Sequence, residues 1–243
     1  MSLPVSVVVV SRDRPDALYR CVLGLSQVQY TSFEIVVVAD ALGLAALGGF
    51  EGKIKTVLFE EPNISAARNI GIAHSAGEVV AFIDDDAVPE PTWLTHLTEP
   101  LTQQDVSTVG GFVIGRNGIS FQWKARVLDQ DGFASDIEVD ETRSTVIALE
   151  DGQAAKTEGT NMAIRRDVLI GIGGFDPAYH FYLDETDLNM RLAKGGYVTA
   201  ISPLAQVHHG FAASARRRAD RAPSDLFDIG ASWAVFQRKH VPS

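Results

Sequence analysis

The sequence predicts an α/β protein with a mostly parallel central sheet flanked by helices. Two observations favour this class. In the N-terminal part of the chain, short apolar runs alternate with amphipathic helical patterns, which is typical of repeated βαβ units. The apolar run at residues 5–10 is largely valine, as in a strand that is covered on both faces.

The N-terminal elements follow one another in a regular order. Pro15 suits the first turn of a helix, and Leu18, Val22 and Leu25 recur at the i, i+4 and i+7 positions of one helix face. Asn63 is expected to cap a later helix. The same patterns predict strands at residues 35–39, 57–59 and 78–83, and helices at residues 64–75 and from residue 89 onward.

The C-terminal half gives weaker signals. Residues 115–157 are rich in acidic side chains and show no clear period, and we interpret them as the substrate-specific part. The whole of residues 1–243 is expected to form a single domain. The other patterns predict strands at residues 106–114, 159–164 and 198–201, and helices at residues 167–170, 185–193 and 225–239.

Composition limits the function classes. The chain has 21 Lys and Arg residues against 31 Asp and Glu residues, a net charge of −10, which speaks against a general nucleic-acid binder. A single cysteine, Cys21, leaves no internal disulfide or cysteine zinc cluster, and it falls on the apolar side of a predicted helix. No run approaches the roughly 18–20 apolar residues of a membrane span. We expect a cytoplasmic protein, with peripheral contact at the cytoplasmic membrane face left open.

Three adjacent carboxylates, Asp84, Asp85 and Asp86, follow the apolar strand at residues 78–83. Like charges repel at this spacing, but a hard divalent cation such as Mg²⁺ or Mn²⁺ prefers oxygen ligands. Ligands of open α/β sheets bind outside the carboxyl ends of the strands. The sequence therefore predicts a metal site here. The alternative is that Asp84 caps the next helix and its neighbours are solvated.

Two further groups follow strand ends. The loop from Ser11 to Arg14 comes after the first strand, and Asp40 ends the second, where it could accept a hydrogen bond from a base or ribose. A turn or helix cap is an equally good interpretation of Asp40. Arg68, among small residues in the helix at residues 64–75, suits phosphate oxygens, although a solvent-facing helical arginine is common.

The last group, Asp184, Glu185 and Asp187, lies at the start of a predicted helix. Negative charge is favoured at a helix N-terminus, so an ionised carboxylate there could act as a general base. The alternative is an acidic helix N-terminus in which Asp187 and Arg191 form a surface pair at i, i+4.

Taken together, these motifs resemble the inverting glycosyltransferases of family two, which use the GT-A nucleotide-diphospho-sugar transferase fold. The resemblance covers nearly the whole chain except residues 115–157. It would divide the chain into a nucleotide-sugar-binding half at residues 1–112, an acceptor and catalytic half at residues 113–223, and a C-terminal helix at residues 224–243. The motifs that carry it are residues 5–9, 66–71, 82–86, 159–162, 173–176 and 184–188.

The resemblance implies a role for each matching residue. Asp86 would bind a Mn²⁺ or Mg²⁺ ion that bridges the donor diphosphate, and His208 would complete its coordination. Glu185 falls at the position of the catalytic base. Donor contacts are implied for Ser11, Arg12, Asp13, Asp40, Arg68, Asp84 and Asp85, and Asn161 and Asp187 would lie near the acceptor or the sugar. The implied partners are a nucleoside-diphospho-sugar donor and a glycan, lipid-linked or small-molecule acceptor.

The chain departs from the family pattern at two places. The second strand commonly ends in Asp-Asp-Gly-Ser, but Asp40 is followed here by Ala41 and Leu42. The base position holds Glu185, one methylene longer than the usual aspartate, and Asp184 could share its role. The basic group formed by residues 216–218 and Arg221 is expected either to fold over the diphosphate or to form an exposed loop.

Two other functions fit parts of the sequence. An apolar strand followed by Asp84, Asp85 and Asp86 also fits haloacid-dehalogenase phosphatases, in which Asp84 would be the nucleophile, although that motif usually lies on the first strand. A sugar-nucleotide binding module without catalysis is the other alternative. The acidic pair at residues 184–185 counts against it.

Overall fold

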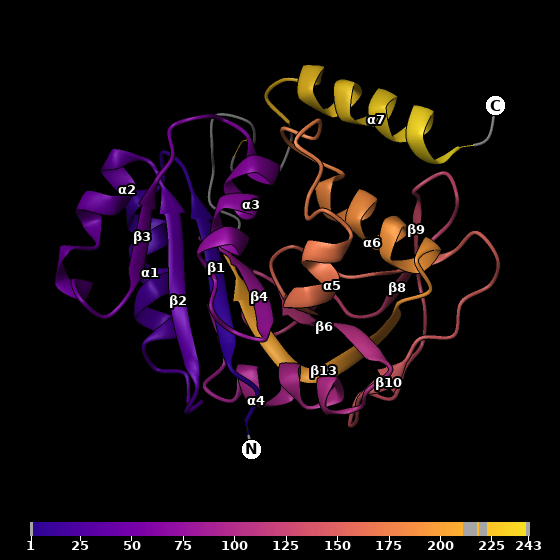
Figure 1. Ribbon diagram of the computed structural model, residues 1–243, viewed down its shortest axis with the longest axis horizontal. Helices are drawn as coiled ribbons and strands as arrows, with labels where there is room; N and C mark the ends of the chain where they lie inside the picture. Colours follow the sequence, from indigo (N-terminus) through magenta and orange to yellow (C-terminus); the bar gives the residue numbers. More distant parts are fainter. Residues whose placement is uncertain (1, 211–217, 219–222, 242–243) are drawn as a thin grey trace.

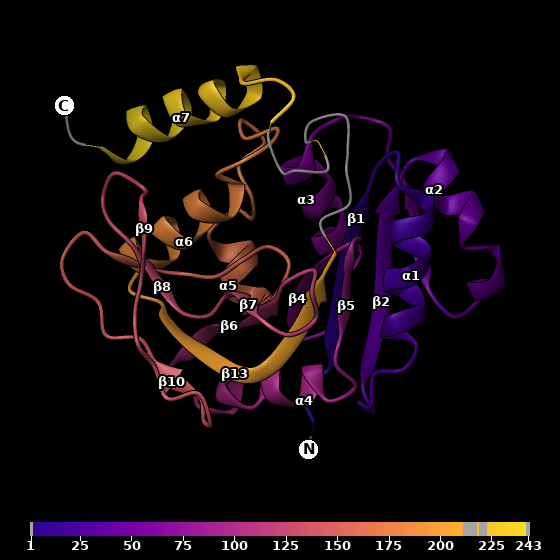
Figure 2. The same ribbon diagram turned by 180° about the vertical axis from the view of Figure 1, so that it is seen from behind.

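The computed structural model describes residues 2–210, 218 and 223–241, and it confirms the predicted α/β class: a curved central sheet carries helices on both faces (Figures 1 and 2). The N-terminal elements are β1 (Val5–Ser11), α1 (Pro15–Leu25), β2 (Phe33–Ala39), α2 (Ala41–Ala46), a 3₁₀ turn (Gly48–Phe50), β3 (Lys55–Leu58), α3 (Ile64–His74), β4 (Val79–Asp84), β5 (Ala87–Pro89), α4 (Trp93–Thr98), a second 3₁₀ turn (Pro100–Thr102) and β6 (Val106–Ile114).

The C-terminal elements vary more in length, from the two residues of β10 to the 14 residues of α7. Five short strands replace the irregular stretch that the sequence left uninterpreted. The elements are β7 (Phe121–Trp123), β8 (Arg126–Leu128), β9 (Ala134–Asp136), β10 (Thr145–Val146), β11 (Ala154–Lys156), β12 (Met162–Arg165), α5 (Arg166–Gly171), α6 (Asp184–Lys194), β13 (Val198–His209) and α7 (Phe227–His240).

The central sheet is parallel on one side and mixed on the other. Among the described residues, ten strands join it, with β10-β13-β6-β12-β4-β1-β2-β3 as the main order. The strands β4, β1, β2 and β3 run parallel, whereas β12 is antiparallel to both of its neighbours, β4 and β6. Because β1 aligns Val10 with Val38 of β2 and with Asp84 of β4, the loops after these strands emerge at one edge.

Two apolar layers hold the helices to the sheet. Alternation along β1 sends Val7 and Val9 to one face, where they pack with α1 and α4, and Val8 to the other, where it packs near α3, α5 and α6. Cys21 is fully buried in the first layer, as its position on α1 predicted. Asn63 caps α3 by accepting a hydrogen bond from the Ala66 amide at 2.9 Å, also as predicted.

A smaller unit covers the C-terminal side of the sheet. The strands β11, β8 and β9 form a separate three-stranded sheet. α7 lies over α6 and beside β9 in both views (Figures 1 and 2), and its Phe236 is fully buried against Tyr179 and Met190. None of the helices within the described ranges is both long enough and apolar enough to span a membrane.

Two boundaries differ from the sequence prediction. The segment at residues 87–89 forms β5, paired with β13, before α4 begins at Trp93. β13 continues to His209 instead of ending at residue 201, with a register shift against β6 between Ser202 and Gln206. Pro203 lies in that shifted part, which is why the sequence suggested that the strand ended there.

Candidate active site

The acidic residues at the end of β4 do not share one environment. Asp84 ends the strand, and Asp85 and Asp86 form the tight turn into β5. The side chain of Asp85 is fully buried, whereas Asp84 and Asp86 line a common cleft. Ligand atoms of Asp84, Asp86 and His209 lie within 4.8 Å of one another. The predicted cation site is therefore built from the outer two aspartates.

Arg14 and Ser11 hold the side chain of Asp85, the middle aspartate, in place. The Ser11 hydroxyl donates a hydrogen bond to Asp85 Oδ2 at 2.6 Å, and an Arg14 nitrogen lies 2.5 Å from Asp85 Oδ1. The other Arg14 guanidinium nitrogen is 3.2 Å from Asp86 Oδ2. Burial raises the pKa of Asp85 to about 7, although Arg14 favours its ionised form. Ser11 and Asp85, expected as donor contacts, thus bind each other and support the turn.

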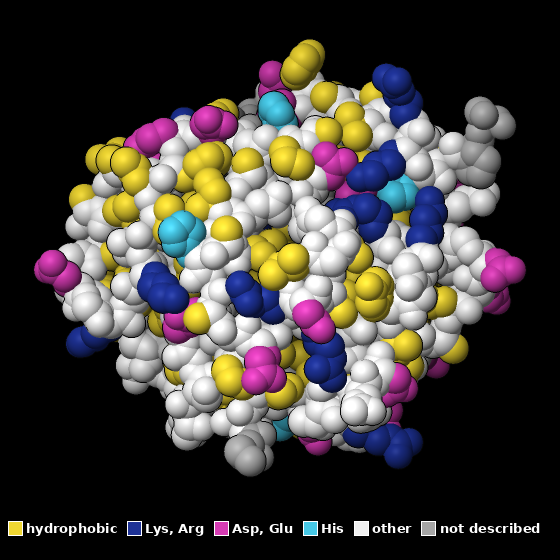
Figure 3. Space-filling view, in the orientation of Figure 1, with side chains coloured by type: hydrophobic (Ala, Val, Ile, Leu, Met, Phe, Trp, Pro, Cys, Tyr) yellow, Lys and Arg dark blue, Asp and Glu magenta, His cyan; other side chains and the backbone are white. Residues whose placement is uncertain are grey.

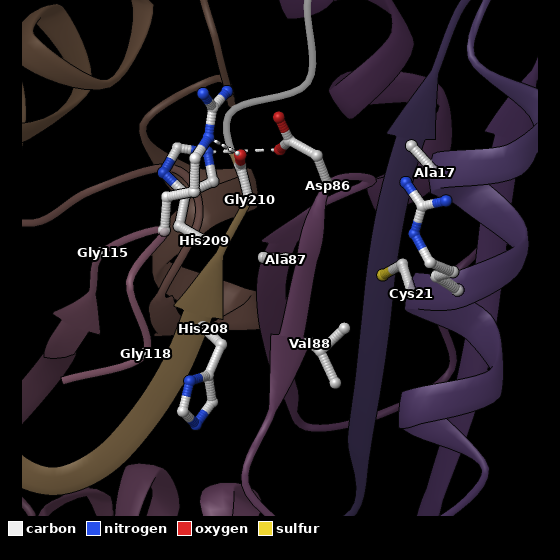
Figure 4. Close-up of a pocket in the computed structure, with 12 residues that line it drawn as sticks. Ala17, Cys21, Asp86, Ala87, Val88, Gly115, Gly118, His208, His209 and Gly210 are labelled. Carbon is white, nitrogen blue, oxygen red and sulfur yellow. Dashed lines mark hydrogen bonds and ion pairs between the residues drawn. The ribbon is translucent and has the colours of Figure 1, made fainter.

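The structure corrects the predicted histidine ligand. Antiparallel pairing sets His209 opposite Ala87 and His208 opposite Val88, so successive side chains leave β13 on opposite faces. His209 Nε2 lies 3.2 Å from Asp86 Oδ1, whereas His208 Nε2 lies 2.6 Å from Glu90. Figure 4 shows the His208 ring pointing away from Asp86. The structure thus places His209, rather than His208, beside the two aspartates that could hold a cation.

Arg68 connects the two acidic groups. Its buried guanidinium forms an ion pair with Asp184 and lies 3.2 Å from Asp84 Oδ1. A Cβ atom at Gly159 would overlap this guanidinium, so the glycine leaves the space that Arg68 occupies. Arg68 thus lies between the two acidic groups with protein carboxylates as its partners, and its contact with a donor phosphate stays a prediction.

Glu185 and Asp184 are adjacent but differ in access. The Glu185 side chain is 23% exposed in the cleft, whereas Asp184 is 3% exposed and faces Arg68. Lys156 Nζ lies 3.4 Å from Glu185 Oε1 and 3.3 Å from Glu158 Oε2. Burial raises the pKa of Asp184, whereas the Lys156 ammonium, acting against burial, lowers the pKa of Glu185. Glu185 is therefore the member of the pair whose carboxylate is more exposed in the cleft, and Lys156 favours its ionised form.

The cleft has a volume of about 500 Å³. It contains the cation site, Arg14, Arg68 and Glu185, and it also exposes aromatic side chains. Among its lining residues are Trp123, Phe133, Phe181, Tyr182 and Trp233. The same space thus joins anionic groups to aromatic surface.

A second hollow of about 430 Å³ adjoins the cleft at the ends of β1, β2 and β3. Arg14, Ile64 and Phe181 line both spaces, and Arg12 and Asp13 line the second. Asp40 supports this wall: its carboxylate accepts hydrogen bonds from the amides of Gly43 and Asp13, each at 2.8 Å. The helix-cap alternative for Asp40 is confirmed, and its contact with a base stays a prediction.

Two predicted site residues lie elsewhere. Asn161 is fully buried, where it accepts a hydrogen bond from the Trp93 indole and donates to the carbonyls of Phe112 and Ala205. Asp187 pairs with Arg191, as the alternative interpretation proposed, but the pair is not on the surface, because the Asp187 side chain is fully buried on another face of α6. Their expected places near the acceptor are therefore replaced by structural roles. Of the basic group at residues 216–218 and Arg221, all but Arg218 lie outside the described residues.

The chain matches the family model "Glycosyl transferase family 2" over residues 6–173. This range includes β1, Arg68 and the acidic turn after β4. The chain belongs to glycosyl transferase family 2.

Curated relatives of this glycosyl transferase family 2 chain are distant and longer. "O-antigen biosynthesis protein RfbC" of Myxococcus xanthus is 27% identical over 96% of the chain and 19% of its own length. "Glucosyl-dolichyl phosphate glucuronosyltransferase" of Haloferax volcanii is 28% identical over 72% of the chain and 56% of its own length. The chain therefore corresponds to only part of each of these proteins.

Solved structures confirm the GT-A architecture. GalNAc-T7 with UDP, GalNAc and Mn²⁺ superposes with a TM-score of 0.68 at 16% identity, over 98% of this chain and 54% of that one. A mannosyltransferase from Pyrobaculum calidifontis in complex with GDP-Man and Mn²⁺ gives 0.63 at 17% identity, over 88% of this chain and 59% of that one. At such identity, the likeness concerns the fold.

Sequence reasoning missed three contributors to the cleft. Arg14 lies in a loop that was recognised, but its ion pairs with Asp85 and Asp86 depend on how β1 and β4 align. Lys156 lies on β11, inside the stretch without a readable pattern. His209 adjoins the predicted His208, and only strand register separates them.

Proposed function

We propose that this chain transfers a sugar from a nucleoside-diphosphate donor to an acceptor hydroxyl with inversion at the anomeric carbon. The observation that carries the proposal is the position of the cleft-facing Glu185, whose ionised form Lys156 favours, in the same cleft as Asp84, Asp86 and His209. A phosphatase with Asp84 as nucleophile fits less well, because Asp84 shares its position with a potential cation ligand set and an arginine.

The ligand set suits a hard divalent cation. Two carboxylates and one imidazole are acceptable to Mn²⁺ or Mg²⁺, and the three side chains already lie close enough to share one ion. A bound cation would neutralise negative charge on the departing diphosphate. Both similar solved structures contain Mn²⁺ with a nucleotide or nucleotide sugar, which supports this assignment.

The second hollow suits the nucleoside. It lies outside the carboxyl ends of parallel strands, the usual place of nucleotides in such sheets. Val38, Phe59 and Ile64 give it apolar walls, and Arg12 and Asp13 add polar groups at one side. A nucleoside held there would direct its diphosphate toward Arg14 and the acidic cleft, since Arg14 lines both spaces.

Glu185 performs the proton transfer in this mechanism. Its carboxylate accepts the proton of the acceptor hydroxyl as that oxygen forms a bond to the anomeric carbon. The bond between the anomeric carbon and the diphosphate oxygen breaks on the opposite face, and the nucleoside diphosphate leaves with the electron pair. Arg68 holds Asp184 and orients the start of α6, so that Glu185 points into the cleft.

A thermal-shift panel tests the donor side of the proposal. UDP, GDP, CDP and dTDP are each added with and without MnCl₂. At least one nucleotide should raise the melting temperature more with Mn²⁺ than without it, because ligands of the folded state stabilise by mass action. A panel with no Mn²⁺-dependent stabilisation by any of the four nucleotides would contradict the proposal.

Adjacent histidines provide a matched control. His209→Ala should need about ten times as much ligand for the same Mn²⁺-dependent stabilisation, because it removes one potential cation ligand. His208→Ala should leave that stabilisation unchanged, because His208 contacts Glu90 outside the ligand set. Weaker stabilisation in His208→Ala and unchanged stabilisation in His209→Ala would show that His208 is the cation ligand.

A further inference from the structure

The outer part of the cleft carries an aromatic cluster that the proposed reaction does not use. Phe133 comes from the loop between β8 and β9, Tyr182 precedes α6, and Trp233 lies on α7. The Phe133 and Trp233 ring centroids are 5.2 Å apart with an interplanar angle of 36°, and the Tyr182 and Trp233 centroids are 6.4 Å apart. Three separate segments therefore bring their rings together beside one cleft. We refer to Phe133, Tyr182 and Trp233 as the aromatic platform.

The platform is held by specific contacts. The Asp129 carboxylate accepts a hydrogen bond from the backbone amide of Phe133 at 2.9 Å, which holds the loop between β8 and β9 in place. Gly132 adopts a φ of +86°, and a Cβ atom there would lie 2.7 Å from the Phe236 ring, so a glycine is needed where the loop meets α7. Ser232 donates a hydrogen bond to the Phe181 carbonyl at 2.8 Å and ties α7 to the segment that precedes α6.

The segment that presents Tyr182 has an unusual backbone. Tyr182 and Leu183 have φ values of 73° and 64°, in the left-handed region that bulky residues rarely adopt. Such conformations are strained and are concentrated at functional sites. Here Tyr182 and Leu183 lead directly into Asp184 and Glu185, and all four residues line the cleft.

The surroundings of the platform decide the class of ligand. Phe133 is 60% exposed, so its ring surface is open to a bound molecule. The charged side chains of Lys156, Glu158 and Glu185 line the same cleft. These side chains pair with one another through Lys156, and Glu185 is still 23% exposed to the cleft. A purely apolar chain lying there would remove this carboxylate from water without offering it a hydrogen bond, at considerable cost. A pyranose ring offers both an apolar C–H face for the aromatic rings and hydroxyls for the charged groups.

We propose that the aromatic platform binds a sugar ring of the acceptor, so that the acceptor is a saccharide or glycoside recognised through its sugar. This assignment rests on the proposed function, because it places the acceptor hydroxyl beside Glu185. The platform stacks against one face of the ring, and Lys156 and Glu158 are within reach of its hydroxyls in the same cleft. A lipid chain or another apolar group is the competing occupant.

Binding of simple sugars tests the assignment. Methyl glycosides of glucose, galactose, mannose and N-acetylglucosamine are titrated into the protein in the presence of Mn²⁺ and the most stabilising nucleoside diphosphate. 1-Octanol serves as the apolar probe, and saturation-transfer NMR and tryptophan fluorescence report binding. At least one glycoside should bind through its C–H face and change the Trp233 emission. Binding of 1-octanol alone, or of no probe, overturns the proposal.

Substitutions in the platform assign the binding to these rings. Trp233→Leu should raise the dissociation constant of the glycoside about tenfold and Phe133→Leu about threefold, as expected for the loss of aromatic contacts. Phe227→Leu is the matched control, because Phe227 begins α7 and is 76% exposed but does not line the cleft. Glycoside affinity that is equal in Phe133→Leu and Phe227→Leu places the sugar elsewhere and contradicts the proposal. Since Phe133 is exposed, its variant remains informative even where Trp233→Leu unfolds.

The donor experiment separates the two proposals. A protein that binds a nucleoside diphosphate with Mn²⁺ but no glycoside retains the proposed function and refutes the aromatic platform as a sugar site. A protein that binds glycosides on the platform without any nucleotide-dependent stabilisation refutes the proposed transfer and retains the sugar site.

Discussion

The two acidic groups of the cleft, residues 84–86 and residues 184–187, look alike in sequence but use their carboxylates differently. In the first group, the two outer aspartates reach the cleft and the middle one is buried. In the second, Glu185 is partly exposed in the cleft, Asp184 is nearly buried beside Arg68, and Asp187 lies on another face of α6. Each group thus divides its charges between the site and the scaffold.

The backbone explains the difference. Around the end of a strand, side chains alternate, so residues two apart share a side, as Asp84 and Asp86 do. On a helix, successive residues point about 100° apart, so Asp184 and Glu185 diverge and Asp187 faces Arg191 and α7. Counting carboxylates in a motif therefore does not tell which of them carry chemistry.

Exchange of Glu185 should give the largest effect. Glu185→Gln is expected to lower kcat by about 10²–10⁴, because a general base contributes on this scale, while nucleotide binding stays nearly unchanged. Steady-state kinetics with a donor and acceptor pair, together with the nucleotide thermal shift, would measure both. Full activity of Glu185→Gln combined with an inactive Asp184→Asn would transfer the role of base to Asp184.

Asp187 should matter for stability rather than for turnover. It lies 2.8 Å from His240 Nε2 and from Lys239 Nζ, and basic side chains gather over α6 and the end of α7 on this face (Figure 3). Asp187→Asn removes the buried carboxylate that His240, Lys239 and Arg191 contact and should cost about 3 kcal/mol in the free energy of unfolding at pH 7. Urea denaturation gives this value. A lower kcat without a lower free energy of unfolding would instead support the predicted place of Asp187 near the acceptor.

The pH dependence of this stability has a definite sign. Against the effect of burial, the hydrogen bond from His240 and the charge of Arg191 lower the pKa of Asp187 to about 2. A carboxylate with a lowered pKa in the folded state stabilises above its unfolded pKa, about 4, and this contribution is lost as the pH falls toward 2. Asp187→Asn should therefore lose less stability than the wild type between pH 4 and pH 2.

Asp86 and Asp85 give a contrast within one motif. Bound nucleotide at about 100 times its dissociation constant stabilises by about 2.7 kcal/mol, and Asp86→Asn should lose the Mn²⁺-dependent share of this shift. Asp85→Asn should lower the melting temperature of the free protein but keep the shift, because Asp85 contacts Ser11 and Arg14 instead of the cleft. Equal loss of the Mn²⁺-dependent nucleotide shift in both variants would show that Asp85 and Asp86 do not differ in this role.

Removal of Lys156 should have the smallest effect. Asp184, Arg68 and Lys156 are the charged groups around Glu185, and the Lys156 ammonium contributes most to lowering its pKa. Lys156→Met should therefore raise the pKa of Glu185. In a plot of kcat against pH, the acidic limb should move to higher pH by about one unit. Lys156→Arg is the control and should restore the wild-type profile. An unchanged limb in Lys156→Met would show that Lys156 does not act on Glu185.

Local sequence patterns were enough to predict the N-terminal half of the fold and to locate the acidic turn that could hold a cation. The valine-rich run of β1, Pro15 at the start of α1 and the Asn63 cap are local signals, and local signals suffice for parallel strands and their helices. The acidic turn at residues 84–86 was recognisable because three adjacent carboxylates after a buried strand need a counter-charge.

Which side chains face the cleft depends on long-range packing that local patterns do not reveal. The choice of His209 over His208 depends on the register of β13 against β5, and the meeting of Glu185 with Lys156 depends on how α6 packs on β11. The aromatic platform joins residues up to 100 positions apart, since Phe133 lies against Trp233. Such contacts carry no local pattern, because they follow from the packing of the whole chain.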